Sequence, residues 1–124
     1  MKIISFNSIK GTGKYNNDIY NIYDDFCYVM DGATAVFNDN IFFETSDLYE
    51  YMQLLKINTL DSKTITYSIR NGIKKSNVGL TNIEKNNEWE LPTFTISAIK
   101  ENKNNYDLYL LCDCLISIFL LKKN

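Results

Sequence analysis

The spacing of apolar residues changes twice along the chain. Short apolar stretches predict strands in the first third, and alternating stretches predict strands again in the last third. Between them, apolar residues recur at the three- and four-residue spacing of a helix. The expected strands are residues 3–9, 18–23, 26–30, 93–99, 106–111 and 115–121. Because strands, helices and strands come in blocks without βαβ alternation, the pattern predicts one antiparallel α+β domain over residues 1–124.

Two helices are expected in the middle section. The first has a single apolar stripe, which consists of Leu48, Tyr51, Met52 and Leu55. Its N-terminus can be capped by Thr45, Ser46 or Asp47, and Asp47 with Glu50 has the spacing of a capping box. The second helix begins near Asp61-Ser62 and places Ile65, Ile69 and Ile73 on one face. Gly72 and Gly79 weaken this second helix, since glycine has a low helix propensity.

Turns and alternation organise the strands. Tight turns are expected at Asp24-Asp25 and over residues 102–105. Within residues 93–99, Phe94, Ile96 and Ala98 face one way and the intervening Thr95 and Ser97 face the other.

Composition excludes several classes of protein. The net charge is −2 and 12 of the 13 basic residues are lysine, which provides no basic field for nucleic acid. The N-terminus lacks the apolar region of a signal peptide, and the longest apolar run, residues 108–121, is too short and too polar to span a bilayer. Three cysteines are an odd number, and in a chain without a signal peptide they indicate reduced thiols. We therefore expect a cytoplasmic protein without a membrane or nucleic-acid partner.

The sharpest candidate for chemistry is Asp31-Gly32, a carboxylate directly after an apolar strand. Hard divalent cations bind such oxygens, and a following glycine lets a backbone carbonyl approach the same ion. Asp18 lies at the same end of the preceding strand if the two strands pair across Asp24-Asp25, so the two carboxylates make a candidate Mg²⁺ or Mn²⁺ site. The alternative is that Asp31-Gly32 is a common turn pair and Asp18 belongs to a polar loop.

Other motifs are weaker. Asp113 interrupts an apolar run, so it lies at a turn, is hydrogen-bonded or binds a metal, since a lone buried carboxylate is costly. Cys112 and Cys114 form a Cys-x-Cys pair, but with only Cys27 besides them they fit small core residues better than a zinc site. The absence of histidine excludes Ser-His-Asp and Cys-His mechanisms. The loop over residues 11–14 lacks the spacing of a phosphate-binding P-loop.

Four segments in order resemble the PP2C-type metal-dependent protein phosphatases, in particular the bacterial branch. Lys14-Tyr15-Asn16-Asn17-Asp18 is similar to its Lys-x-Asn-Glu-Asp element, and Asp31-Gly32-Ala33-Thr34 is similar to its Asp-Gly-Ala-Thr element. Residues 92–98 resemble the strand after the two long helices of the family, and residues 111–114 resemble its Gly-Asp-Ser hairpin. The resemblance spans nearly the whole chain.

This resemblance implies a fold and a set of roles. The fold would be an antiparallel β-sandwich flanked by helices, and the function would be metal-dependent dephosphorylation of phosphoserine or phosphothreonine proteins by a metal-activated water. Asp31 would bridge two Mn²⁺ or Mg²⁺ ions, Gly32 would offer its carbonyl oxygen, and Asp18 would hold metal-bound water. Lys14 would stand near the basic residue that steadies the substrate phosphate, and Asp113 would match an acidic position linked to a third metal.

The sequence departs from the family pattern at positions that lower the activity we expect. Asn17 stands where the family has glutamate, Cys112 and Cys114 replace glycine and serine, and the later aspartates of the family have no counterpart. We therefore expect the N-terminal half of a PP2C-like domain, with weak or no activity alone. A pseudophosphatase that binds a protein partner and a non-functional remnant are the alternatives. The apolar C-terminal residues 115–121 predict self-association or binding of a separately made C-terminal half.

Overall fold

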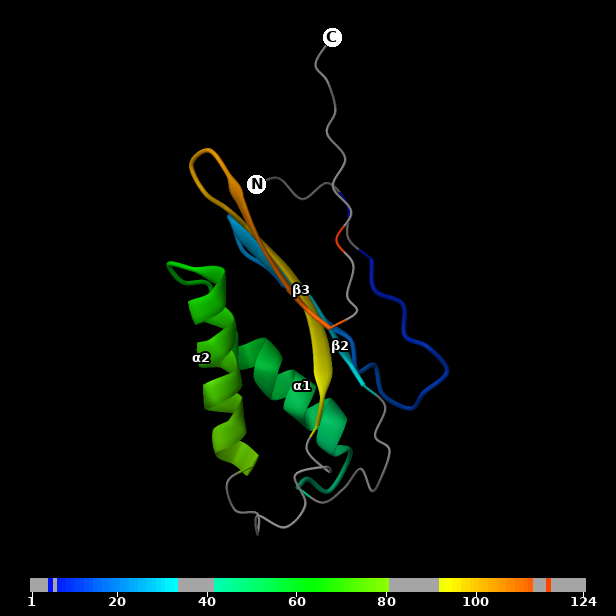
Figure 1. The fold of residues 1–124 in the computed structure, drawn as a ribbon. Coiled ribbons are helices and arrows are strands. Elements are labelled where there is room, and N and C mark those ends of the chain that lie inside the picture. The colour runs from blue at the N-terminus through cyan, green and yellow to red at the C-terminus, as the bar shows by residue number, and fades with distance from the viewer. Residues whose placement is uncertain (1–4, 6, 34–41, 81–91, 113–115, 117–124) are drawn as a thin grey trace.

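The computed structural model of the chain describes residues 5, 7–33, 42–80, 92–112 and 116. Two strands come first, β1 (Ile19–Ile22) and β2 (Phe26–Gly32), followed by helices α1 (Asp47–Asn58) and α2 (Ile65–Asn77) and a single 3₁₀ turn, η1 (Val78–Leu80). Two further strands, β3 (Phe94–Glu101) and β4 (Tyr106–Leu111), complete the described elements. The predicted α+β class and the order of strands, helices and strands are confirmed (Figure 1).

One antiparallel sheet holds all four strands in the order β1-β2-β3-β4. β1 and β2 form the predicted hairpin, with Ile19 opposite Met30 and Ile22 opposite Cys27. β3 and β4 form a second hairpin, whose turn is closed by backbone hydrogen bonds between Asn102 and Asn105. The central pair, β2 and β3, joins segments more than sixty residues apart in the sequence. Long-range pairing of this kind is decided by burial of the shared face and not by local turn chemistry.

Both helices cover the same face of the sheet, and the described residues 7–14 run along its other side (Figure 1). The predicted stripe of α1 is buried, as are Ile65 and Ile69 of α2. From the sheet, the apolar residues that point toward the helices include Ile19 of β1, Phe26, Tyr28 and Met30 of β2, and Ile96 and Ala98 of β3. The core therefore lies between one sheet face and two helices, and the alternation expected for residues 93–99 is confirmed.

The helix starts differ from the expectation in detail. Ser46 is the N-cap of α1, and its hydroxyl accepts a hydrogen bond from the Tyr49 backbone. The predicted capping box of Asp47 with Glu50 is wrong, because the Asp47 carboxylate accepts instead from the backbone N–H groups of Phe42 and Phe43. α2 is capped by Thr64, three residues after the predicted Asp61.

Gly72 lies in the middle of α2, where it lets the helix approach the end of α1. A Cβ atom added there would be 2.9 Å from the Thr59 Cα and 3.0 Å from the Thr59 Cβ. Ser68 and Ser76, one turn to either side of Gly72, are also small and buried. The glycine that lowers the helix propensity of the segment is thus required by packing.

Two expected strands have no counterpart among the described residues. Residues 5 and 7–9 form no strand, and the rest of the stretch 3–9 lies outside the described residues. The predicted strand 115–121 also lies outside them, except for Ile116, which is not in a strand. No helix in the described ranges is long and apolar enough to cross a membrane.

Cys112 follows β4 with a φ of 65°, the only positive φ among the described non-glycine residues. The left-handed conformation costs an L-residue about 1–2 kcal/mol. Replacing Cys112 by glycine removes this cost, while the added freedom of the unfolded chain takes back about 0.4–1 kcal/mol. We therefore expect Cys112→Gly to raise the free energy of unfolding by about 0.5 kcal/mol and Cys112→Val to lower it by about 1 kcal/mol.

Urea unfolding measures both changes, with Cys112→Ser as the control that removes the thiol but keeps the steric cost. A glycine variant less stable than the serine variant would contradict this account.

Candidate functional site

Asp18 and Asp31 line one shallow depression on the sheet face that is turned away from the helices. Its volume is about 270 Å³, and its other described lining residues are Asn7, Ser8, Ile9, Ile19, Tyr20 and Val29. Both aspartates are exposed to solvent. The structure thus brings together the two carboxylates that the sequence analysis proposed as metal ligands.

The strand register explains why these two carboxylates meet. Ile19 lies opposite Met30 in an antiparallel pair, so Asp18, the residue before Ile19, lies beside Asp31, the residue after Met30. Successive residues of a strand alternate between its faces, and Ile19 and Met30 both point into the core. Asp18 and Asp31 consequently share the opposite face, with Tyr20 and Val29 next to them.

Gly32 is closely packed on the helix side of the sheet. A Cβ atom at this position would be 3.0 Å from the Asn17 carbonyl oxygen and 3.1 Å from both the Asn17 Cβ and a Leu48 methyl carbon. The Asn17 Cβ therefore lies against Gly32 on the helix side of the sheet, on the other side of the strand from Asp18. The Asn17 Oδ1 atom is buried and has no hydrogen-bond partner among the described residues. Asn17 is thus not a third ligand for the aspartate pair.

Lys14, the predicted phosphate-steadying residue, lies outside the depression. Its ammonium is 4.9 Å from the centre of the Tyr15 ring, and that ring stacks on Tyr49 of α1 at 4.8 Å. The pKa of Lys14 is raised by its contact with the Tyr15 side chain. The side chain is fully exposed, so it can reposition. Its role in binding phosphate stays a prediction.

The third predicted acidic group, Asp113, lies outside the described residues, as does Cys114. Cys27 and Cys112, which the structure describes, are free thiols in different places. Within the described ranges, no group of three or more cysteine, aspartate or glutamate side chains is placed to hold a metal ion. The candidate site therefore consists of two carboxylates and the neighbouring polar side chains of the N-terminal segment.

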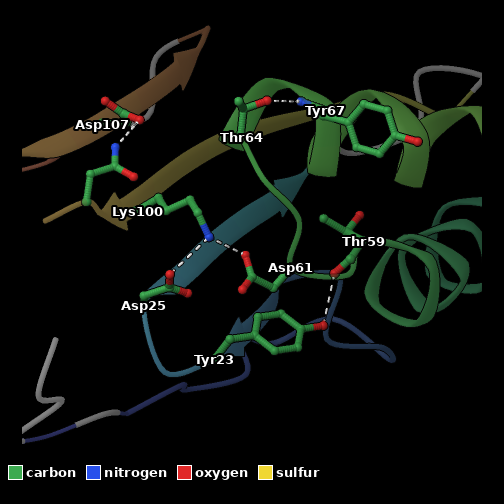
Figure 2. A network of polar contacts seen from close by, with 9 residues as sticks. Tyr23, Asp25, Thr59, Asp61, Thr64, Tyr67, Lys100 and Asp107 are labelled. Atoms are coloured by element: carbon green, nitrogen blue, oxygen red, sulfur yellow. Dashed lines mark hydrogen bonds and ion pairs between the residues drawn. The ribbon is translucent and has the colours of Figure 1, made fainter.

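A polar cluster that the sequence analysis missed lies at the opposite end of β2. Lys100 of β3 is only 5% exposed, and its ammonium donates to Asp61 Oδ1 at 2.6 Å and to Asp25 Oδ2 at 3.2 Å (Figure 2). Tyr23 supports the same region, because its hydroxyl donates to the Thr59 carbonyl at 3.1 Å. These contacts join the β1–β2 turn, the loop between the helices and β3.

The charges of this cluster are mutually stabilised. Burial works to lower the pKa of Lys100, but its hydrogen bonds to Asp61 and Asp25 raise the pKa above its ordinary value. The hydrogen bond from Lys100 likewise lowers the pKa of Asp25, against a smaller opposing effect of burial. The cluster is about 20 Å from Asp31, the length of the six residue steps from Asp25 to Asp31 in an extended strand. It therefore stabilises the fold and takes no direct part in the aspartate site.

Comparisons of this chain with protein families, with curated proteins and with solved structures find no significant match.

Proposed function

We propose that this chain is a PP2C-like unit that binds Mn²⁺ or Mg²⁺ through Asp18 and Asp31 and acts on, or binds, phosphoserine or phosphothreonine proteins. The observation that carries the proposal is the shared depression of these two aspartates. Asp18 and Asp31 occupy the positions that match the acidic elements of the family, and they meet at one end of a hairpin although thirteen positions separate them in the sequence.

The residues of the site fit a hard divalent cation. Carboxylate oxygens are the ligands that Mg²⁺ and Mn²⁺ prefer, and both ions keep several waters when protein ligands are few. A bound ion would supply charge stabilisation for a phosphate and a nucleophilic water. The chain itself holds the two carboxylates at the ends of paired strands, which fixes their separation. Lys14 would attract the phosphate group.

Two further features support the resemblance to the family. The left-handed φ of Cys112 is a conformation that glycine adopts without strain, and glycine is the residue that the family has at the matching position. The sheet face opposite the helices also carries apolar side chains, including Val29 and Leu108, as the inner face of a sandwich requires. We propose that this sheet forms one layer of a PP2C-like β-sandwich.

A second candidate function is phosphoprotein binding without turnover. It is favoured by the small number of carboxylates, because two-metal hydrolysis needs both ions held in fixed geometry. Asp18 and Asp31 are the only described acidic residues that line the depression, and Asn17, at the position of a family glutamate, points to the other side. The two candidates share one metal site and differ only in turnover.

We expect the purified chain to bind Mn²⁺ weakly, with a Kd of about 10⁻⁴ M or higher, because two carboxylates make a sparse set of ligands. Asp31→Asn is expected to weaken this binding at least tenfold, since it removes one of two anionic ligands. Calorimetry or the electron paramagnetic resonance signal of free Mn²⁺ measures both. Phosphatase activity on a phosphoserine peptide with Mn²⁺ is expected to be low or absent.

Asp24→Asn is the matched control, because Asp24 lies in the turn of the same hairpin and does not line the depression. Mn²⁺ binding that is absent at millimolar concentrations, or that survives in Asp31→Asn, would overturn the metal site. Robust Mn²⁺-dependent turnover that is lost in Asp31→Ala would decide for the phosphatase over the binding module.

A further inference from the structure

β4 is an exposed edge strand with apolar side chains on both faces. Tyr106, Leu108 and Leu110, on the face away from the helices, are 57%, 45% and 51% exposed. Leu111, on the helix side, is also exposed. Among the described strands, β4 pairs only with β3. An apolar edge of this kind is a template for pairing with another strand.

The backbone groups available at this edge follow from the turn. Asn102 and Asn105 exchange two backbone hydrogen bonds and therefore form a hydrogen-bonded pair. From this pair onward, non-hydrogen-bonded and hydrogen-bonded residue pairs alternate along β3 and β4. Asp107, Tyr109 and Leu111 therefore direct their N–H and C=O groups toward β3. The N–H and C=O groups of Tyr106, Leu108 and Leu110 point outward, away from β3. The edge thus offers three donors and three acceptors at alternate residues.

We propose that β4 pairs antiparallel with β4 of a second copy of this chain, about a twofold axis at Leu108. In this register Leu108 lies opposite Leu108 of the second copy, and Tyr106 lies opposite Leu110 of the second copy. Every residue whose backbone groups point outward is therefore paired with another such residue. Each such pair exchanges two hydrogen bonds, which gives six across the axis. The two sheets become one continuous sheet with the helices of both copies on the same side. This proposal is independent of metal binding.

The side chains of β4 are compatible with pairing to themselves. Its only charged residue, Asp107, lies opposite Tyr109 of the partner copy in this register, so like charges do not face each other. β4 carries no lysine or proline of the kind that blocks edges in other proteins. β1, the other edge, is only four residues long and offers fewer bonds. β4 is therefore the edge that a second copy fits.

The expected dimer is reversible. One six-residue strand paired with its copy buries less than the roughly 1,600 Å² of a standard stable interface. Sedimentation velocity on the full chain, from about 1 µM to about 200 µM, is expected to show a shift from monomer to dimer. Leu108→Lys is expected to weaken dimerisation at least tenfold, because it puts like charges opposite each other on the axis.

Val29→Lys is the matched control. It places the same charge on the same sheet face but in the interior strand β2, away from the edge. We expect this variant to dimerise as the unchanged chain does. If Val29→Lys abolishes the dimer and Leu108→Lys does not, the copies stack face to face and the edge pairing is wrong. A monomer at all concentrations would also overturn it.

Cross-linking tests the register directly. In a variant whose three cysteines are serine, Leu108→Cys should form an intermolecular disulfide under mild oxidation, because paired strands place opposite Cα atoms about 5.5 Å apart. Ile22→Cys, at the end of β1, is the control and should not cross-link. Cross-linking through Ile22→Cys alone would assign the dimer to β1 and contradict the proposal.

Discussion

Replacing Gly72 by alanine is expected to destabilise the protein by about 3 kcal/mol, the upper end of the cost of overpacking. The added Cβ would lie 2.9 Å from the Thr59 Cα, so a change of side-chain rotamer cannot relieve the clash. Thr59 is fully buried and its backbone N–H caps α1 by bonding to the Leu55 carbonyl at 2.8 Å. The helices would have to separate, which disturbs the core that both share.

The stability lost to the clash is expected to exceed the stability gained from the higher helix propensity of alanine. Alanine in place of glycine favours an isolated helix by about 1 kcal/mol, so propensity alone predicts a stabilised variant. Thermal or urea unfolding distinguishes the two outcomes, since a loss of about 3 kcal/mol lowers Tm by roughly 10 °C in a domain of this size.

Asn71→Ala is the control for Gly72→Ala, at the neighbouring position of α2 and on its half-exposed side. It should change the free energy of unfolding by no more than about 0.5 kcal/mol. If Gly72→Ala lowers the free energy of unfolding no more than Asn71→Ala does, α2 does not pack on Thr59 as described.

Replacing Lys100 by methionine is expected to cost about 2–3 kcal/mol, because it leaves Asp25 and Asp61 close together without a cation. This is less than the loss for a fully buried pair, since the two carboxylates are 45% and 32% exposed and water can solvate them in part. Methionine preserves most of the apolar stem of Lys100 and removes the ammonium, which lies 5.9 Å from the centre of the Phe26 ring, so the change mainly removes the charge. Lys103→Met, in the exposed β3–β4 turn, is the control and should be nearly neutral.

The stability that Lys100→Met removes depends on pH in a defined direction. The pKa of Asp25 is lowered from its ordinary value of 3.8, so its contribution to stability is complete above that pH and is lost as the pH falls further. The pKa of Lys100 is raised from 10.5, so its contribution is complete below that pH and is lost as the pH rises above it. The stability difference between the unchanged chain and Lys100→Met should therefore be largest between about pH 4 and pH 10.

Changing all three charged residues of the Lys100 cluster tests whether Lys100 stabilises the protein through its charge. In a background with Asp25→Asn and Asp61→Asn, the same Lys100→Met change should cost less than in the unchanged chain, because no carboxylates are left uncompensated. An equal cost in both backgrounds would show that Lys100 acts through packing and not through charge.

Elements defined by neighbouring residues could be predicted from the sequence. The β1–β2 hairpin, the apolar stripe of α1 and the β3–β4 turn all depend on contacts within a few positions, where spacing and turn residues are informative. The pairing of Asp18 with Asp31 followed from the same hairpin. The capping residue of α1 could not be chosen, because Thr45, Ser46 and Asp47 are all good caps and only the contacts of Asp47 with Phe42 and Phe43 select among them.

Lys100 shows where the local pattern was informative but incomplete. The alternation that places Phe94, Ile96 and Ala98 on the core face places Lys100 there too, so its burial could have been predicted. Its partners could not, because Asp25 and Asp61 come from two distant segments. A lysine at an inward position of a strand is a signal for such a cluster, since a buried cation needs carboxylates nearby.

The sequence by itself determined the α+β class, the periods of the helices and strands, and the two carboxylates at the end of one hairpin. Only the tertiary structure decided that β2 pairs with β3, that both helices cover one face, and that Gly72 is a contact point where local propensity indicates a weak position in a helix. The reason is physical. Periodicity reports which side of an element is apolar, whereas the partner of that side is selected by burial across the whole chain, which no local window contains.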